Sequence, residues 1–124
     1  MIQEARINDW LAAYRRAWTT DDPAEVARLF TRDALYFTEP FGEPHAGSDQ
    51  IVDFWVGEGD SRIPWSFESQ VLAQEGDLYV VRALVTYPDG TRGDGPAEVY
   101  HAVWLVTLTG DRAAEFVEYY TLEE

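Results

Sequence analysis

The spacing of apolar residues divides the chain into a helical N-terminal part and a β-rich C-terminal part. Near the N-terminus, apolar residues recur at intervals of three and four, which is the period of one face of an amphipathic helix. Arg6, Asp9, Arg15 and Arg16 lie off this stripe. The pattern therefore predicts a first helix whose buried face carries Ile7, Trp10, Leu11, Tyr14 and Trp18.

Two further helices are indicated by their capping residues. Asp22 can cap a helix that has Pro23 in its first turn, and this helix is expected to bury Val26, Leu29 and Phe30 and to end at Arg32-Asp33. Ser48 can cap a third helix over residues 49–56, which would bury Ile51, Val52 and Trp55 before Gly57 and Gly59 end it.

Strands are predicted at residues 35–38 and, after a change of period at Trp65, throughout the C-terminal half. Alternation places Trp65 and Phe67 on one face of a strand that turns at Gly76-Asp77. Residues 78–87 are apolar on both faces and so predict a central strand, followed by strands over 97–109 and 112–122. The chain has no linker or repeat. We expect a single domain over residues 1–124, an α+β fold in which helices pack on a curved antiparallel sheet as a cone-shaped half-barrel.

Composition narrows the classes of partner. Hydrophobic residues make up 46% and aromatic residues 15% of the 124 residues, enough for a substantial core. Nine basic against 23 acidic residues give a net charge of −14, which argues against nucleic acid and anionic membranes as partners. The acidic surface is read as a solvated face, with a docking face for a basic partner as the alternative.

Localisation and cofactors are predicted from what the sequence lacks. It contains no Cys, no apolar run of membrane-spanning length and no basic, apolar N-terminal leader, so a cytoplasmic protein is expected. His45 and His101 have no neighbours at ligand spacing. No metal site and no cofactor are expected.

The most informative stretch is residues 29–55, which places Glu39-Pro40 at the end of a short strand between aromatic residues. A carboxylate in an apolar pocket has a raised pKa and can act as a general base. A solvated turn carboxylate is the alternative, since Glu is seldom buried without a partner.

The order of parts in this stretch resembles the nuclear transport factor 2-like superfamily, and most closely its SnoaL-like and ketosteroid isomerase-like branches. The matching motifs are LFTRDA at residues 29–34, PFG at 40–42 and GSDQI at 47–51 followed by Phe54 and Trp55. The resemblance implies a cystatin-like, cone-shaped fold. It does not fix the reaction, because this fold carries isomerases, dehydratases, cyclases, epoxide hydrolases and proteins without activity.

Residue by residue, the resemblance to the isomerases is incomplete. Tyr14 and Asp22 are separated by the same number of residues as the family's tyrosine donor and the Asp that opens its second helix. Glu39 stands where the family has its general base. The family's second donor, a protonated Asp, aligns with Trp104 or Val103. Its two supporting tyrosines align with Phe30 and Trp55, so the hydroxyl network that those tyrosines form in the family is expected to be absent here.

Period two and the resemblance together predict the pocket lining and the last strand. Phe116, Glu118 and Tyr120 share one face of that strand, whereas His101 falls on the face opposite Trp104. Glu39 and Glu118 are read either as an acid and base pair or as two separate exposed carboxylates. The expected lining is Trp18, Phe37, Phe54, Trp55, Trp65, Phe67, Trp104, Phe116, Glu118 and Tyr120.

These observations leave open two main function classes. In the first, a SnoaL-like enzyme acts on a small apolar carbonyl substrate, polyketide-like or steroid-like, with Glu39 as base and Tyr14 as donor, by isomerase, cyclase or dehydratase chemistry without a cofactor. In the second, the domain only binds a ligand or dimerises, and its pocket is vestigial. An accessory subunit of a larger enzyme is a third class. Apolar residues on both faces of residues 97–109 also predict a homodimer formed through the sheet.

Overall fold

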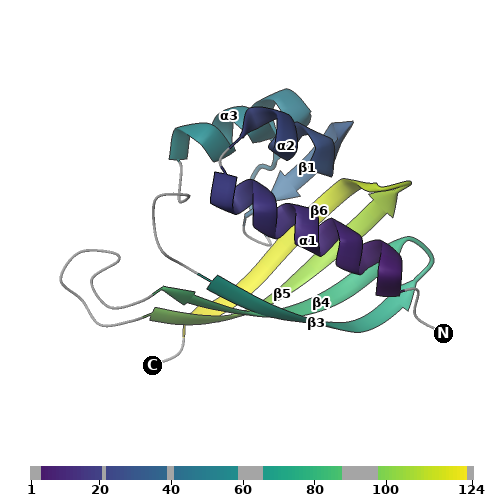
Figure 1. Cartoon of the computed structure of the whole chain (residues 1–124), viewed down its shortest axis with the longest axis vertical. Coiled ribbons are helices and arrows are strands. Elements are labelled where there is room, and N and C mark those ends of the chain that lie inside the picture. Colours follow the sequence, from purple (N-terminus) through teal and green to yellow (C-terminus); the bar gives the residue numbers. More distant parts are fainter. Residues whose placement is uncertain (1–3, 21, 39–40, 59–65, 88–97, 123–124) are drawn as a thin grey trace.

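The computed structural model describes residues 4–20, 22–38, 41–58, 66–87 and 98–122, which form three helices and six strands. Helices α1 (Glu4–Thr20), α2 (Pro23–Leu29) and α3 (Ser48–Glu58) all lie over one face of the curved sheet (Figure 1). None of these helices is long and apolar enough to cross a membrane. The arrangement confirms the predicted α+β class.

Helix α2 begins where the sequence predicts and ends earlier. The Asp22 side chain accepts a hydrogen bond of 2.9 Å from the backbone N–H of Ala24 and so caps the helix. The prediction that this helix continues to Arg32-Asp33 is wrong, because Phe30 is already extended, with φ −126° and ψ 148°. The indole N–H of Trp10 donates a 2.9 Å hydrogen bond to the carbonyl of Leu29 and ties the end of α2 to α1.

The sheet is mixed and open, with strand order β2-β1-β6-β5-β4-β3. Strands β3 (Ser66–Glu75), β4 (Leu78–Tyr87), β5 (Glu98–Thr109) and β6 (Arg112–Leu122) form the predicted antiparallel meander. Strand β1 (Phe30–Phe37) pairs in parallel with β6 and antiparallel with the two-residue strand β2 (His45–Ala46). The N-terminal part of the chain is therefore joined to its last strand.

A glycine with positive φ fixes the entry to α3. Gly47 has φ 87°, a conformation that L side chains rarely adopt, and its N–H donates a 2.7 Å hydrogen bond to the carbonyl of Ala34 in β1. Its own carbonyl accepts the hydrogen bond of Ile51 in the first turn of the helix. This glycine therefore connects β1, β2 and α3 at one corner of the molecule.

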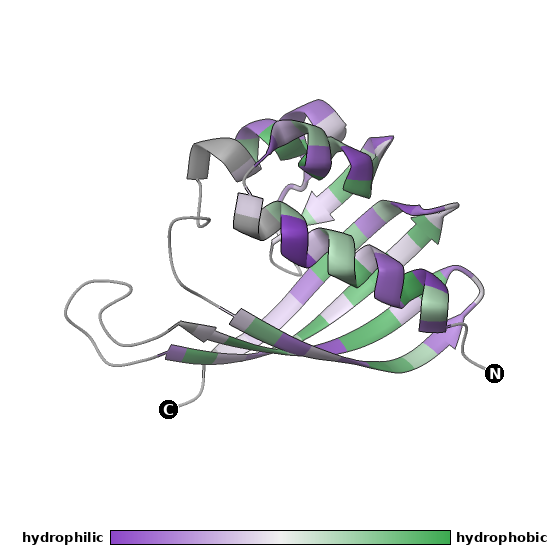
Figure 2. Ribbon diagram, viewed as in Figure 1, coloured by the Kyte–Doolittle hydropathy of each residue, from purple (hydrophilic) through white to green (hydrophobic). Residues whose placement is uncertain are grey.

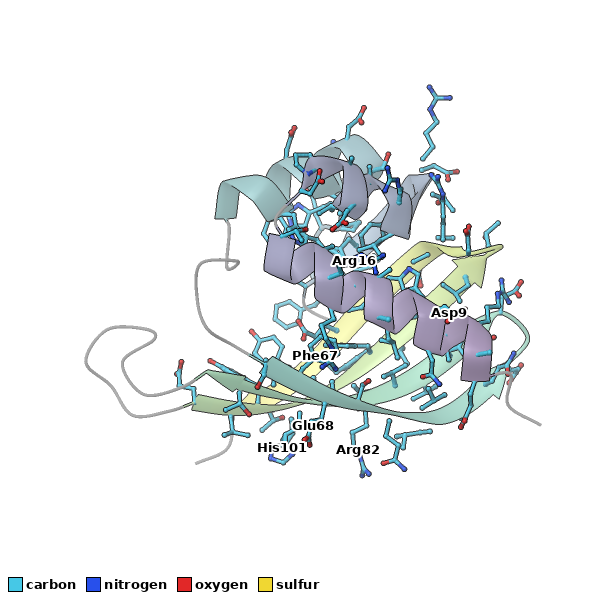
Figure 3. The ribbon with its side chains drawn as sticks, viewed as in Figure 1. Asp9, Arg16, Phe67, Glu68, Arg82 and His101 are labelled. Carbon is cyan, nitrogen blue, oxygen red and sulfur yellow. The ribbon has the colours of Figure 1, made fainter. Side chains whose placement is uncertain are left out.

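The two faces of the sheet have different side chains. On the face covered by the helices, alternate residues of β4 and β5 and two residues of β6 are buried. Hydrophobic and hydrophilic residues are interspersed along these strands (Figure 2). On the opposite face Glu68, Arg82 and His101 point away from the helices (Figure 3). The predicted outward orientation of His101 is thereby confirmed. In β3 to β6 the buried residues of the covered face are Phe67, Tyr79, Val81, Ala83, Val85, Ala102, Trp104, Val106, Leu108, Ala113 and Phe116, and in β1 they are Phe30, Ala34 and Tyr36.

Candidate functional site

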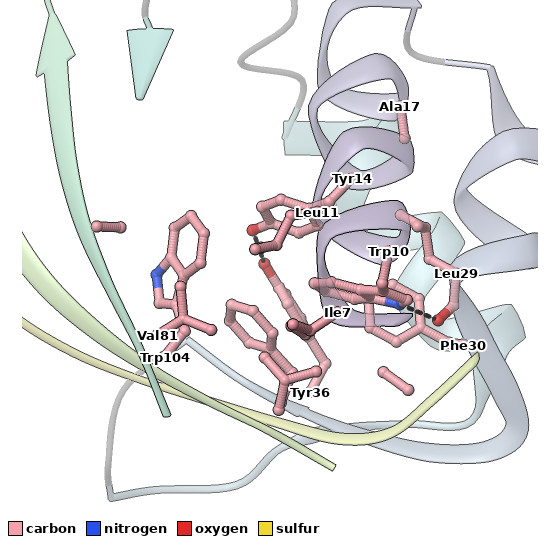
Figure 4. Packing of buried hydrophobic residues seen from close by; sticks show 14 of the residues in the cluster. Ile7, Trp10, Leu11, Tyr14, Ala17, Leu29, Phe30, Tyr36, Val81 and Trp104 are labelled. Carbon is pink, nitrogen blue, oxygen red and sulfur yellow. Dashed lines mark hydrogen bonds between the residues drawn. The ribbon is translucent and has the colours of Figure 1, made fainter. Parts of the chain in front are cut away.

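The interior between α1 and the sheet is built from aromatic rings centred on Tyr14 (Figure 4). The Tyr14 ring stacks on Trp10 at a centroid distance of 5.1 Å and on Phe116 at 5.6 Å. Trp104, Trp55 and Phe67 meet it edge to face at 5.3, 5.4 and 6.1 Å. Stacked and edge-to-face contacts are the favourable arrangements of aromatic rings. Tyr14 is 3% exposed and is thus a core residue as well as a candidate donor.

The hydroxyl of Tyr14 has a tyrosine partner that the sequence comparison did not predict. It lies 3.3 Å from the hydroxyl of Tyr36 in β1, and both side chains are 3% exposed. Tyr36 thus supplies a hydroxyl partner at a position other than the two that the family uses. Neither Phe30 nor Trp55 provides this partner, which comes instead from a neighbouring strand.

The alternation of side chains between the two faces of β1 could have predicted that Tyr36 is buried. Ala34 and Tyr36 are buried under the helices, whereas Phe37 is half-buried and follows Tyr36 on the opposite side of the strand. The sequence analysis placed Phe37, and not Tyr36, in the pocket lining. The structure places Phe37 opposite Val117 of β6, on the outer face, so it does not share the face that carries Tyr36.

A carboxyl group adjoins this aromatic interior. Glu118 and Trp104 are direct partners across β5 and β6, and the indole Nε1–H of Trp104 donates a 2.9 Å hydrogen bond to Oε2 of Glu118. Burial raises the pKa of the Glu118 carboxyl above its ordinary value, and the Trp104 N–H offsets only part of this rise. A half-buried carboxyl of this kind can hold or release a proton at a pH closer to neutrality than a solvated one.

Glu118 stands at the boundary between core and solvent. Two residues before it on the same face, Phe116 is 1% exposed, and two residues after it, Tyr120 is 48% exposed. The Tyr120 ring meets Tyr100 edge to face at 5.8 Å. On the far side, Arg15 of α1 lies 4.3 Å above the Phe67 ring and donates a 2.9 Å hydrogen bond to the Phe67 carbonyl.

Several predicted lining residues do come together in this interior. Trp55, Phe67, Trp104 and Phe116 are buried around Tyr14, and Phe54 is half-buried beside Tyr36 at a centroid distance of 6.2 Å. Glu39 and Trp65 lie outside the described residues, as does the side chain of Trp18. The predicted base is thus one residue beyond Thr38, where the described part of this segment ends.

His45 is closer to the aromatic interior than its loop-like sequence suggests. It pairs with Tyr36 across β1 and β2 and stacks on Phe54 at a centroid distance of 4.0 Å. The signal was the position of His45 two residues before Gly47, where the chain turns into α3. Within the described ranges, no three His, Cys, Asp or Glu side chains gather in a metal-binding arrangement.

A separate groove of about 530 Å³ lies at the end of the sheet near the C-terminus of β6. It is lined by Phe41, Arg82, His101, Ala102, Val103, Tyr119, Tyr120 and Thr121. Four large hydrophobic side chains are exposed in the described part of the chain, and three of them, Phe41, Tyr119 and Tyr120, line this groove. An exposed aromatic cluster of this kind is typical of a contact surface.

Comparison with known sequences gives one family. The sequence model of the SnoaL-like domain matches residues 11–116, which include the C-terminal part of α1, the Tyr14–Tyr36 pair and Trp104. The match ends two residues before Glu118. Among curated proteins, no relative matches the chain.

Solved structures share the fold at low sequence identity. A protein assigned as a SnoaL-like polyketide cyclase from Shewanella putrefaciens is 20% identical, with a TM-score of 0.73 over 97% of this chain and 80% of that one. SalBIII, an epoxide hydrolase/cyclase-like enzyme of pyran ring formation in salinomycin, is 15% identical, with a TM-score of 0.75 over 98% and 95%. A ketosteroid isomerase-like fold from Catenulispora acidiphila, in complex with trimethylamine, is 20% identical, with a TM-score of 0.69 over 90% and 85%.

Proposed function

Because this chain belongs to the SnoaL-like domain family, we propose that it binds a small apolar molecule beside its aromatic interior and acts on a carbonyl group of that molecule. The observation that carries the proposal is the pairing of polar groups with buried rings. The Tyr14 and Tyr36 hydroxyls and the Trp104–Glu118 pair are held in an otherwise apolar environment. Few polar groups in an apolar setting are typical of small-molecule sites.

The proposed chemistry is proton transfer next to a carbonyl group. Glu39 removes a proton from the carbon adjacent to the carbonyl, and the electrons of the broken C–H bond form an enolate. The Tyr14 hydroxyl donates a hydrogen bond to the enolate oxygen, and Glu39 returns the proton to another atom of the substrate. Such donors act most strongly where water is excluded, and the 3% exposure of both Tyr14 and Tyr36 provides this condition.

The substrate class follows from the surroundings and from the neighbours. Aromatic rings favour a flat or fused-ring skeleton, and structural neighbours named as a polyketide cyclase and an epoxide hydrolase/cyclase-like enzyme support a polyketide-like or steroid-like carbonyl compound. A net charge of −14 disfavours anionic substrates by long-range repulsion.

The test is exchange of the carbonyl-adjacent protons of beta-tetralone, a fused-ring ketone, followed by proton NMR in deuterated buffer. The wild-type protein is expected to accelerate the exchange, and Glu39→Gln to reduce it to the background rate. Glu43→Gln is the matched control, because Glu43 is an exposed acid four residues after Glu39 in the sequence. Equal exchange in wild type and Glu39→Gln would remove Glu39 from the mechanism.

One observation favours the second function class, a domain that binds without catalysis. Five aromatic rings surround Tyr14 at centroid distances of 5.1 to 6.1 Å, which is ordinary core packing. If beta-tetralone binds without any exchange above background, a binding or dimerisation module is the function that remains.

A further inference from the structure

The groove at the C-terminal end of β6 combines exposed aromatic rings with basic side chains. Its lining includes the rings of Phe41, Tyr119 and Tyr120 and the basic groups of Arg82 and His101. None of its eight described lining residues is acidic, although the chain has 23 acidic residues against nine basic ones. A volume of about 530 Å³ is within the range of small-molecule sites.

The register of the sheet places the basic groups and one ring on the same outer face. Arg82 of β4, Val103 of β5 and Tyr119 of β6 are successive partners across these strands. His101 precedes Val103 by two residues, so it shares their face, and it points away from the helices as Arg82 does (Figure 3). Two strand spacings, roughly 10 Å, separate the backbone at Arg82 from that at Tyr119. A ligand that contacts both ends of this row is therefore elongated.

The positive charge of Arg82 is not neutralised by any acid in the described part of the chain. Its Nη2 group donates a hydrogen bond to Oε1 of Gln70 on β3, which is an uncharged amide. The ion pairs among the described residues involve Arg6 and Arg16 instead. A guanidinium has five N–H donors in a planar fork that matches a carboxylate, so the bond to Gln70 leaves donors for an anion.

We propose that this groove binds a flat aromatic carboxylate, whose carboxylate group contacts Arg82 and whose rings pack against Tyr119 and Phe41. His101 is a diagonal neighbour of Arg82 across β4 and β5, and such neighbours lie roughly 7 to 8 Å apart, within reach of the same ligand. Exposed rings favour stacking with another flat ring. This site lies on the face of the sheet opposite the Tyr14 interior and is independent of the proposed carbonyl chemistry.

The net charge of −14 is compatible with an anion in this groove. Repulsion between exposed charges is screened over roughly 8 Å at physiological ionic strength, so the groups that line the groove decide which charge it accepts. Glu68 also points from this face, but it lies on β3, with Leu84 between it and His101. Local charge therefore favours a carboxylate over a cation.

The experiment compares 2-naphthoate with its uncharged analogue 2-naphthamide by isothermal titration calorimetry at neutral pH and physiological ionic strength. The two probes share the ring system, so the ratio of their affinities isolates the contribution of the anionic group. The wild-type protein is expected to bind 2-naphthoate about tenfold more tightly, which is the effect of charge-assisted hydrogen bonds to one carboxylate.

Two arginine variants form a matched pair. Arg82→Gln removes the charge in the groove and should bring the ratio of affinities close to one. Arg112→Gln removes the same charge from the exposed first residue of β6, at the other end of that strand, and should leave the ratio unchanged. Tyr119→Ala removes a ring and no charge, so it should weaken both probes by the same factor.

Three results would overturn the inference. The first is equal affinity of the two probes for the wild type. The second is an equal loss of the ratio in Arg82→Gln and Arg112→Gln, because the charge would then act at long range and not in a site. The third is no binding of either probe. Light scattering on the same samples would then show whether a second copy of the chain covers the groove instead.

Discussion

At the scale of single residues, two polar side chains face the same apolar interior and are accommodated differently. Tyr14 keeps its hydroxyl buried by pairing it with Tyr36, whereas Glu118 remains half-buried and pairs one oxygen with Trp104. Burying a hydroxyl group costs little free energy when the group is hydrogen-bonded, whereas burying a charged group costs much more. Substitutions at the two positions should therefore change stability in opposite directions.

Replacing Tyr14 by Ala should lower the free energy of unfolding by about 3 to 5 kcal/mol, because five neighbouring rings lose a packing partner. Tyr14→Phe loses only the hydroxyl and leaves that of Tyr36 with one partner fewer, so about 1 kcal/mol is expected. Urea denaturation followed by tryptophan fluorescence measures both. Tyr119→Ala is the control, since Tyr119 is 46% exposed. An unchanged midpoint for Tyr14→Ala would contradict the assigned helix register.

Replacing Glu118 by Gln should make the protein more stable at neutral pH. Because burial raises the folded-state pKa of Glu118, the folded protein binds this proton more tightly than the unfolded chain does. The contribution of this proton to the free energy of unfolding is fully present below the pKa of Glu118 in the unfolded chain, and it is lost as the pH rises through the pKa of Glu118 in the folded protein. Glu118→Gln should remove this loss. The free energies of unfolding of the wild type and the variant should therefore differ more at neutral than at acidic pH. Denaturation curves over a pH series test it, with the exposed Glu115→Gln as control.

At the scale of elements, the sequence predicted what depends on local chemistry. The bounds of β4 and β6 agree with the predicted ranges, and the cap at Asp22 is present, because apolar alternation, turn glycines and capping residues act over a few positions. The sequence analysis placed the end of α2 too late, at Arg32-Asp33 instead of Leu29. The apolar Phe30 and the polar Thr31 fit the hydrophobic pattern of a continuing helix, so the pattern did not mark the end.

What the sequence could not predict depends on distant pairing. The parallel alignment of β1 with β6 joins Tyr36 to Phe116 and brings the Tyr36 hydroxyl to Tyr14. No local pattern specifies that contact. For the same reason the Trp104–Glu118 hydrogen bond, which depends on the register of two long strands, was not predicted, although Glu118 itself was assigned to the inner face.

The cap of α2 provides a prediction at this scale. Asp22→Ala removes the side-chain acceptor of the Ala24 N–H and should lower the free energy of unfolding by about 1 kcal/mol. Asp22→Asn should retain most of the stability that the cap provides, since Asn is also an effective capping residue. Thermal unfolding followed by circular dichroism measures the difference. Equal destabilisation by Asn and Ala would show that the charge of Asp22 matters more than the cap.

At the scale of the whole molecule, none of the described helices covers the outer face of the sheet. Its centre carries half-buried Val80, Val103, Leu105 and Val117 in neighbouring rows, and the groove with Phe41 and Tyr119 adjoins it. Apolar patches of this kind usually mark interfaces. We propose that two copies of the chain associate through this face.

Leu105→Arg should therefore convert a dimer into a monomer, because a guanidinium would be buried at the centre of the interface without a partner. Thr109→Arg is the control, since it adds the same charge at the exposed end of the same strand. Light scattering at micromolar concentration measures the mass. With a net charge of −14 on each copy, association should strengthen as salt is added. A wild-type monomer at all salt concentrations would contradict the proposal.

The parallel pairing of β1 with β6 has a consequence for how the chain folds. Phe30 pairs with Ala113 and Tyr36 with Phe116, so these contacts close a loop that contains most of the chain. Closing such a loop costs entropy before any contact forms, and topologies rich in distant contacts fold slowly. The hairpins of β3 to β6 can assemble earlier, because each joins neighbouring segments. The Tyr14–Tyr36 pair would then be among the last features to form, and a nascent chain would acquire it only after β6 has been synthesised.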